Sequence, residues 1–475
     1  MRRLVLLALG VALGLTAPAS AFTPTDPFVP RQWYLTANHT YDAWSALPQL
    51  DPVRIAIVDS GVDGGHPELE NRIVAARSFV GGSPRVDTDG HGTFVAGLIA
   101  AEVDDGIGIA GSFPAAQLVI AKAVAPDGTI PEGAEARAIR WAVDEGARVI
   151  NLSFGGVRDP VDLARDTYSA EEADAVAYAV AHHVVVVAAV GNGDQAPREP
   201  WPFASYPAAL PHVLGVSAYA RDGAVPDFSN RDRLLNDVAA PGLGILSTFP
   251  RNLTAERPDC SEQGYSSCGP EEYRVAEGTS FAAPQVAAAA AMLISLEPRL
   301  TPDQVTTILE RSATDMSPVT GCDRCPVGRD ALSGWGRLDV AAAVAALGRP
   351  LPPPDSLEPN DGVGSHAATL WGSTRTVAAT IDFWDDPTDV YRVRLRKAQK
   401  LFVVLSGRLA GAVSLHLLAP GATSPDETIG LLEVARRHGA VQRLAYRATA
   451  GGFYSLVLTA TRPWSGAYRL ELAKS

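Results

Sequence analysis

Short apolar runs alternate with longer segments of helical period between residues 53 and 347. The runs are rich in Val and Ile and show no polar alternation; they occupy residues 53–58, 118–124, 148–152 and 184–190. Segments of helical period lie between them, at residues 93–102, 131–147 and 171–182. Strands without polar alternation are buried on both faces of a sheet. The pattern therefore predicts the α/β class, with a doubly wound, mostly parallel sheet flanked by helices.

A helical tail and a proline-rich segment follow this α/β pattern. Helical periodicity continues at residues 280–296, 301–314 and 337–347. Residues 349–354 then read Arg-Pro-Leu-Pro-Pro-Pro, and such a run is extended and stiff because proline withholds helix donors. We expect a domain that covers residues 22–348, a linker at 349–357 and a second domain at 358–475.

The hydrophobic period changes to two after the linker. Tyr391, Val393 and Leu395 alternate with arginines, and Tyr468 and Leu470 alternate with charged residues in the same way. This alternation is typical of half-buried strands, and further strands are expected at residues 401–405, 413–418 and 453–459. About 120 residues of short alternating strands predict a small all-β sandwich domain.

The N-terminal segment has the order of a secretory signal peptide. Two arginines precede an apolar run at residues 4–15, and the small residues Ala19, Ser20 and Ala21 follow it. We expect cleavage after Ala21 and a secreted protein. The apolar run is shorter than the roughly 20 residues that span a bilayer, so no stable membrane anchor is expected. Little sequence then separates Ala21 from the domain that follows, so we expect no N-terminal propeptide of ordinary length.

Charge and cysteine content exclude some classes of function. The formal net charge is −13, which disfavours binding to the phosphates of nucleic acid. The thiols of an exported protein are normally oxidised, so the four cysteines of this chain predict two disulfides. Sequence proximity favours Cys260 with Cys268 and Cys322 with Cys325. A zinc site made from all four thiolates is the alternative, although no group of histidines lies near them.

Three polar residues stand where reactive groups are commonly held. Asp59 ends an apolar run, at the edge where parallel sheets assemble their sites. His91 lies between two glycines at the start of a helical segment, and Ser280 begins an alanine-rich helix whose first turn contains Pro284. Each residue alone has an ordinary structural explanation, since serine commonly caps helices and a histidine can be part of a core. The three signatures together, in the order Asp, His, Ser, point to a nucleophilic serine.

These segments resemble the motifs of the subtilase family. Residues 58–63 (Val-Asp-Ser-Gly-Val-Asp), 89–97 and 278–284 (Gly-Thr-Ser-Phe-Ala-Ala-Pro) resemble its aspartate, histidine and serine motifs. Residues 184–193 resemble the segment that supplies the side-chain donor of the oxyanion hole, here Asn192. The resemblance covers residues 23–347 and implies a subtilisin-like fold. It also implies a serine endopeptidase with Asp59, His91 and Ser280 as catalytic triad.

The resemblance further implies how substrate is bound. Residues 151–156 resemble the family strand that pairs with an extended peptide, so we expect polypeptide substrates and broad specificity. Ser153, Phe154 and Gly155 would line the main side-chain pocket together with Ala189, Val190 and Gly191. None of these six is an acid that would attract Lys or Arg. Family resemblance also favours a monomer.

A calcium site is expected from the same resemblance. Asp26 matches the acid that helps bind Ca²⁺ in thermitase-like subtilases, and Glu68 matches a second ligand that is usually Asp. The loop that contains Asp104 and Asp105 falls where the remaining oxygens would come from. Carboxylate and carbonyl oxygens suit Ca²⁺. A solvated acidic loop without a metal is the competing interpretation.

Residues 357–361 (Leu-Glu-Pro-Asn-Asp), 385–391 and 466–468 (Gly-Ala-Tyr) resemble motifs of the pre-peptidase C-terminal domain of secreted bacterial proteases. The resemblance leaves the role of this domain open between substrate or surface binding and a role in stability and secretion only. A catalytically silent binding or adhesion module is the alternative to a peptidase, but it would require loss of a triad or oxyanion residue. An α/β-hydrolase esterase would need Gly-x-Ser-x-Gly and the order Ser, acid, His. A zinc peptidase of the His-Glu-x-x-His type is excluded because that motif does not occur.

The catalytic histidine should make activity depend on pH. With an ordinary pKa of ~6.5 for His91, activity should rise as His91 deprotonates near neutral pH.

Overall fold

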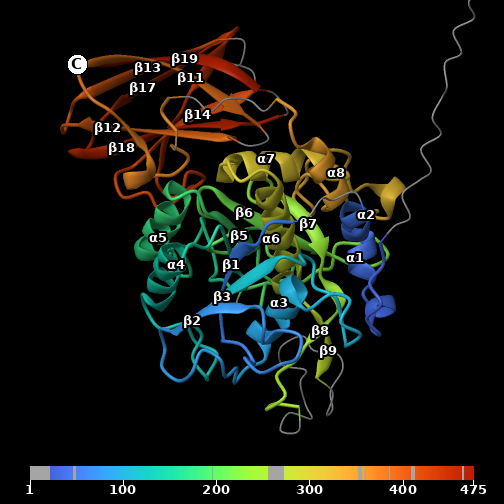
Figure 1. The fold of residues 1–475 in the computed structure, drawn as a ribbon. Coiled ribbons are helices and arrows are strands. Elements are labelled where there is room, and N and C mark those ends of the chain that lie inside the picture. The colour runs from blue at the N-terminus through green and yellow to red at the C-terminus, as the bar shows by residue number, and fades with distance from the viewer. Residues whose placement is uncertain are drawn as a thin grey trace, which may run out of the picture.

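The computed structural model describes most of the chain. The described residues are 22–45, 50–194, 196–254, 272–350, 356–358, 360–383, 386–407, 412–462 and 465–475. They form an α/β part followed by a β-sandwich that sits above helices α5 and α7 (Figure 1). The predicted signal segment and the pair Cys260 and Cys268 lie outside the described residues.

A seven-stranded sheet forms the centre of the α/β part. Its strand order is β2-β3-β1-β4-β5-β6-β7, and every pair of neighbours is parallel. The strands are β1 (Val53–Asp59), β2 (Ile73–Ser78), β3 (Ala116–Lys122), β4 (Val149–Leu152), β5 (Val185–Ala189), β6 (Val213–Tyr219) and β7 (Val238–Pro241). Strands β4, β5 and β6 are buried at every position, because helices cover both faces. The predicted doubly wound parallel sheet is confirmed.

Helices cover the two faces of this sheet with separate apolar clusters. On one face Ile55, Val187 and Val286 belong to one cluster, and on the other Val58 and Ile139 belong to a second. The first cluster is built on α1 (Trp33–Ala37), α2 (Thr40–Ser45), α3 (His91–Ala100), α6 (Thr279–Leu296), α7 (Pro302–Ser312) and α8 (Val340–Ala346). The second is built on α4 (Ala134–Asp144) and α5 (Ala170–Ala181). The remaining elements of this part are η1 (Val29–Arg31), η3 (Pro318–Thr320) and the antiparallel pair β8 (Leu243–Thr248) and β9 (Tyr273–Glu277).

Helix α6 runs through the middle of the α/β part. It is long and apolar enough to cross a membrane by length and composition, yet 89% of it is buried inside the protein. Its alanines let it lie close to the sheet and to α3. Pro284 lies inside the helix and cannot donate to the carbonyl of Ser280, which accepts from the hydroxyl of Ser153 instead. Helix α6 is thus the core helix that brings Ser280 to the edge of the sheet.

The C-terminal part is a sandwich of two five-stranded sheets, as the period-two pattern predicts. One sheet has the order β10-β12-β18-β14-β15 and the other β11-β19-β13-β17-β16. A single apolar cluster that includes Tyr391, Leu405 and Leu470 fills the space between them. The elements are η4 (Gly364–His366), β10 (Ala368–Leu370), β11 (Thr374–Asp382), β12 (Thr388–Leu395), β13 (Lys400–Ser406), β14 (Val413–Leu418), β15 (Leu431–Val434), β16 (Arg436–His438), β17 (Val441–Arg447), β18 (Gly452–Ala460) and β19 (Ser465–Lys474).

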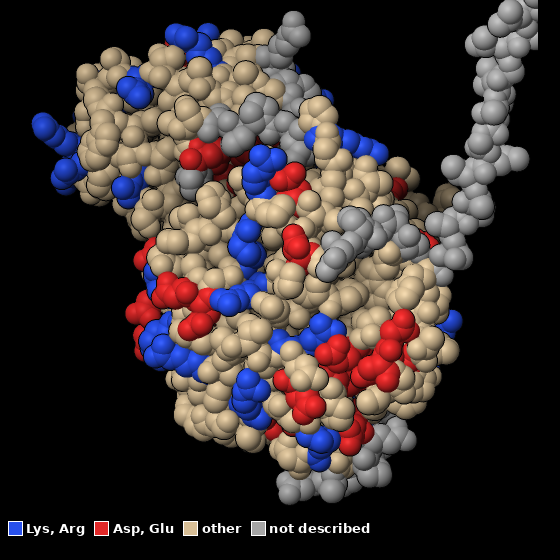
Figure 2. Space-filling model, in the orientation of Figure 1, with Lys and Arg blue, Asp and Glu red and all other residues tan. Residues whose placement is uncertain are grey.

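Charged side chains join the sandwich to the α/β part. Arg311 on α7 pairs with Asp382 on β11, at 3.2 Å between Nη2 and Oδ2. Arg329 donates from Nη1 to the carbonyl of Phe383 at 3.1 Å, and the Phe383 ring meets Trp335 edge-on. Figure 2 shows acidic and basic side chains meeting where the sandwich adjoins the α/β part and interspersed over this face of the α/β part, whereas basic side chains predominate on the visible sandwich.

One of the two expected disulfides falls within the described residues. Cys322 and Cys325 are bonded to each other and buried beside Met316. Two cysteines joined in this way cannot offer thiolates to a metal. The alternative of a zinc site made from all four cysteines is therefore wrong.

Candidate active site

Asp59 and His91 meet at the carboxyl edge of the sheet. Asp59 is the last residue of β1 and is only 2% exposed, while His91 is the first residue of α3. The imidazole Nδ1 lies 2.9 Å from Oδ2 and 3.0 Å from Oδ1 of Asp59. Asp59 Oδ1 also accepts a hydrogen bond from the backbone N–H of Ser60 at 2.7 Å. The carboxylate therefore holds the ring and leaves Nε2 as the nitrogen that can exchange a proton.

Two glycines and a buried aspartate fix the loop that carries His91. A Cβ on Gly92 would lie 2.1 Å from the carbonyl oxygen of Gly61, so only glycine fits, and Gly90 has a φ of +106°. Asp87 is fully buried and accepts hydrogen bonds from the backbone of Gly90 and from the backbone and hydroxyl of Thr93. Asp87 has no motif of its own, so the sequence pattern did not indicate it.

Ser280 and Asn192 approach the same place from two other elements. Ser280 is the second residue of α6, and its carbonyl accepts a hydrogen bond from the hydroxyl of Ser153 at 2.8 Å. Asn192 follows β5, and its Oδ1 accepts hydrogen bonds from Thr279 N at 2.9 Å and Thr279 Oγ1 at 2.7 Å. With Oδ1 engaged, the Asn192 amide presents Nδ2 as a donor beside the start of α6.

The four candidate catalytic residues line one cavity of about 1250 Å³, which we call the cleft. Residues from four chain regions meet there, because β1 and β5 end, and α3 and α6 begin, at the same edge of the sheet. The other predicted residues that line it are Ser153 and Phe154. Three further carboxylates line it, namely Asp89, Asp194 and Glu277, and no Lys or Arg is among its described lining residues.

A smaller cavity of about 690 Å³, the side pocket, adjoins Ser280 and Asn192. Phe154, Gly155, Ala189 and Gly191 line it, as the sequence analysis expected, whereas Val190 is buried in the core cluster shared with α4 and α5. The lining residues that the sequence analysis missed include Val157, Asp194, Trp201, Ser205 and Asn230. Asp194 lies only two residues beyond Asn192 and adds an acid to a pocket expected to have none.

The electrostatics of the site favour the protonated form of His91. Burial alone would lower the pKa of His91, but Asp59, Asp89 and Asp87 outweigh it and raise the pKa to about 9. The carboxylates stabilise the imidazolium, as a general base in an acyl transfer requires once it has taken up a proton. The ordinary value of ~6.5 assumed from the sequence is therefore too low for the protein as folded.

The four acids predicted to bind calcium differ in exposure: two of them are buried and two are exposed. Asp26 is buried and accepts hydrogen bonds from the backbone of Asp104 and Gly106, and burial raises its pKa. Glu68 is fully buried; its Oε1 accepts from Ile109 N and Tyr273 Oη, and burial raises its pKa to about 8. Asp104 and Asp105 are exposed and accept hydrogen bonds from nearby backbone N–H groups.

Glu68 has one oxygen that a bound cation could satisfy, whereas both oxygens of Asp26 already accept from backbone N–H groups. Glu68 Oε2 is buried and has no hydrogen-bond partner among the described residues. A buried carboxylate oxygen without a donor is costly, and a hard cation such as Ca²⁺ would satisfy it. Within the described residues, the acidic group whose ligand atoms lie within 4.8 Å of one another is a different one, on the sandwich side: Glu358, Asp361 and Asp386.

Comparison with known proteins places the α/β part among peptidases. A model of the subtilase family matches residues 51–336, more than half of the chain. Thermitase from Thermoactinomyces vulgaris is 34% identical over 277 residues, which cover 58% of this chain and 86% of thermitase. The thermophilic serine proteinase of Bacillus sp. (strain AK1) is 33% identical over 279 residues, and the match spans 61% of that protein.

Other relatives differ in location and in length. The major intracellular serine protease of Bacillus subtilis (strain 168) is 34% identical over 54% of this chain and 72% of that protein. A solved structure of a protease from Pseudoalteromonas arctica superposes with a TM-score of 0.54 and 26% identity. That match covers 68% of this chain and 99% of the solved chain.

Proposed function

Because this chain belongs to the subtilase family of subtilisin-like serine endopeptidases, we propose that it hydrolyses polypeptides with Ser280 as nucleophile. The observation that carries the proposal is the meeting of Asp59, His91, Asn192 and Ser280 in one cleft. His91 removes the proton of Ser280 as the hydroxyl attacks the scissile carbonyl, and Asp59 stabilises the imidazolium that forms. Asn192 Nδ2 and the backbone N–H of Ser280, at the start of α6, donate to the oxyanion.

Inhibitor labelling tests this proposal directly. A serine-directed phosphonylating reagent is expected to stop casein hydrolysis by the purified protein and to leave one adduct, on the peptide that contains Ser280. Tandem mass spectrometry of the digested protein locates the adduct. A folded protein that neither cleaves casein nor takes up the reagent would favour the catalytically silent binding module instead.

Activity should depend on pH through His91. Only the neutral imidazole can accept the Ser280 proton, and the carboxylates around His91 raise its pKa to about 9. The value of kcat/KM is therefore expected to rise through pH 7 to 9, with its inflection closer to 9 than to ~6.5. Initial rates on a peptide substrate in constant-ionic-strength buffers measure it. A plateau already reached at pH 7 would contradict this assignment.

We propose broad specificity with polypeptide backbone as the main recognition element. Strand β4 pairs with β1 and β5 only as far as Leu152, and the following residues Ser153 and Phe154 line the cleft. Backbone there can add to an extended peptide as an edge strand does. Phe154 and Trp201 give the side pocket an apolar lining, and Asp194 at its rim tolerates a basic residue as well.

We propose that the protein is secreted and works as two domains. The signal-like residues 1–21 and the disulfide Cys322–Cys325 support export to an oxidising compartment. A catalytic domain at 22–348, a linker at 349–357 and a sandwich at 358–475 agree with the end of α8 at Ala346 and the start of η4 at Gly364. N-terminal sequencing of protein from culture medium tests cleavage after Ala21, and a start at Met1 would contradict it.

We propose that Ca²⁺ binds between Asp26 and Glu68, with oxygens of the loop around Asp104 and Asp105 completing the site. Bound Ca²⁺ stabilises the folded state only, by about 2.7 kcal/mol at a hundredfold excess over its dissociation constant. A chelator is therefore expected to lower the melting temperature by several degrees, and added Ca²⁺ should restore it. Calorimetry of Glu68→Gln should show no response to chelator, whereas Glu132→Gln, which removes an exposed carboxylate, should respond like the parent protein. An identical response of both variants would contradict the site.

A further inference from the structure

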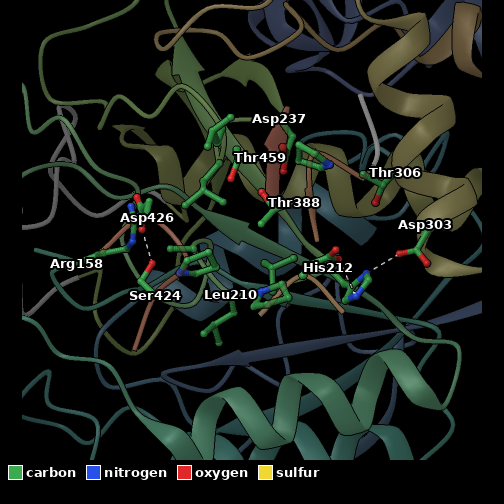
Figure 3. Close-up of a pocket in the computed structure, with 18 of the residues that line it drawn as sticks. Arg158, Leu210, His212, Asp237, Asp303, Thr306, Thr388, Ser424, Asp426 and Thr459 are labelled. Atoms are coloured by element: carbon green, nitrogen blue, oxygen red, sulfur yellow. Dashed lines mark hydrogen bonds and ion pairs between the residues drawn. The ribbon is translucent and has the colours of Figure 1, made fainter. Parts of the chain in front are cut away.

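A cavity of about 950 Å³ lies between the α/β part and the sandwich, and Arg158 is buried in its wall (Figure 3). The Arg158 side chain is 1% exposed, and its Nη1 donates to Asp232 Oδ2 at 2.9 Å. Its Nη2 donates to Oδ2 of Asp426, which belongs to the sandwich and also accepts from the hydroxyl of Ser424. One buried cation is thus shared between a carboxylate of each part.

The same arginine supports one wall of the side pocket. Trp201 lines that pocket, and its indole Nε1 donates to the carbonyl of Arg158 at 3.0 Å. Asp232 Oδ2, which holds the Arg158 guanidinium, also accepts from the backbone N–H of Ala204 at 3.1 Å. The Phe203 ring lies 5.6 Å from Arg158 Cζ and 5.5 Å from the Trp201 ring. The segment 201–204 is therefore attached at one end to the backbone of Arg158 and at the other end to Asp232, its ion-pair partner.

We propose that Asp426 of the sandwich, acting through Arg158, positions the Trp201 wall of the side pocket and thereby sets which substrate side chains the pocket accepts. This inference rests on the proposed peptidase function. Asp426 and Arg158 are positioning residues, since neither lines the cleft that holds the reacting atoms. The sandwich then has a role in specificity in addition to any role in binding or stability.

Because Arg158 is buried, its pairing with Asp426, whose side chain is 36% exposed, stabilises this arrangement. A buried guanidinium that loses one of its two carboxylates keeps its charge and loses half of its compensation. The pKa values show that these charges stabilise one another. Burial would lower the pKa of Arg158, yet Asp426 and Asp232 raise it above its ordinary value. Arg158 in turn lowers the pKa of Asp426 against the opposing effect of burial. Without Asp426, the Arg158 backbone and the Trp201 indole that it holds are expected to shift.

The test compares variants of the full chain on peptides that differ only in the residue before the cleaved bond. Asp426→Asn is expected to lower kcat/KM about tenfold for Phe or Leu at this position, mainly through KM, and less than about twofold for Gly. Asp426→Glu, which keeps the charge, should recover most of the loss. Arg311→Gln is the matched control, because it removes another ion pair between the two parts, to Asp382, away from the side pocket.

An equal loss for Phe, Leu and Gly peptides, or the same profile in Arg311→Gln, would overturn the proposal. A second measurement works without activity: the indole N–H resonance of Trp201, assigned with Trp201→Phe, should move in Asp426→Asn and stay in place in Arg311→Gln. A resonance that does not move would contradict the coupling of Asp426 to Trp201 through Arg158. A parent protein that cleaves no peptide would instead contradict the proposed peptidase function, so failure of the coupling and failure of the function are distinguishable.

Discussion

Replacing Ser280 with Ala is expected to lower kcat for peptide hydrolysis by roughly 10⁶-fold, the size of effect that loss of the nucleophile has in the related subtilisin. The reason is that no acyl-enzyme can form without the hydroxyl, and His91 has no proton to accept from the side chain. Active-site titration and initial rates on a chromogenic peptide measure the loss. Uptake of the phosphonylating reagent should disappear in the same variant.

The variant should fold normally, which separates lost chemistry from lost structure. The hydrogen bond that Ser280 makes to Ser153 uses the Ser280 carbonyl, and alanine retains it. Ser295→Ala is the matched control: it removes a hydroxyl from the other end of α6, where Ser295 donates to Asp51 O, and should keep full kcat. Persistent hydrolysis by pure Ser280→Ala at the parent rate would show that another residue is the nucleophile.

The sequence predicted the strands that are buried at nearly every position. Strands β1, β3, β4 and β5 are mostly apolar and show no polar alternation, so their pattern alone identified them as the interior of a parallel sheet. Strand β2 was missed because only Ile73 of its six residues is buried, which leaves no apolar run to detect. Strand β6 was missed although it is buried throughout, because Gly215 interrupts its apolar pattern and glycine disfavours strands.

The sequence predicted candidate site residues where a local motif accompanied the chemistry. Each catalytic candidate lies in a segment with a recognisable local pattern. Asp59 ends an apolar run, His91 lies between two glycines at the start of a helix, and Ser280 begins a helix. Asp87 could not be found in this way, because its role depends on Gly90 and Thr93 folding around its carboxylate. No pattern in the chain links these residues before the loop is closed.

Contacts between distant segments were also beyond the sequence pattern. Arg158 stands in a polar stretch that reads as surface, and its partner Asp426 lies 268 residues further along the chain. Trp201 and Asp194 line the side pocket because the chain after Asn192 folds back over it, which no periodicity indicates. Val190 lies within the predicted pocket segment but alternates into the core, since successive residues of an extended chain face opposite sides.

Replacing Asn192 with Ala is expected to lower kcat about 10²- to 10³-fold, which is about 3 to 4 kcal/mol of transition-state stabilisation. Removal of the corresponding donor in subtilisin has an effect of this size. Thr279 engages Asn192 Oδ1 through its backbone and its hydroxyl, which leaves Nδ2 as the group offered to the oxyanion. Negative charge on the substrate oxygen develops only as Ser280 attacks, so KM should change little. Separate determination of kcat and KM checks both parts.

A second variant tests whether the orientation of the Asn192 amide matters as well as its presence. Thr279→Val removes the hydroxyl that donates to Asn192 Oδ1 at 2.7 Å but keeps the backbone donor at 2.9 Å. One of two orienting hydrogen bonds is lost, each worth about 1 kcal/mol, so kcat should fall by less than about tenfold. Combining Thr279→Val with Asn192→Ala should then add nothing, because the hydroxyl no longer has an amide to orient. A fully additive loss in the double variant would mean that Thr279 acts on Ser280 by another route, and an unchanged kcat in Asn192→Ala would remove Asn192 from the oxyanion hole.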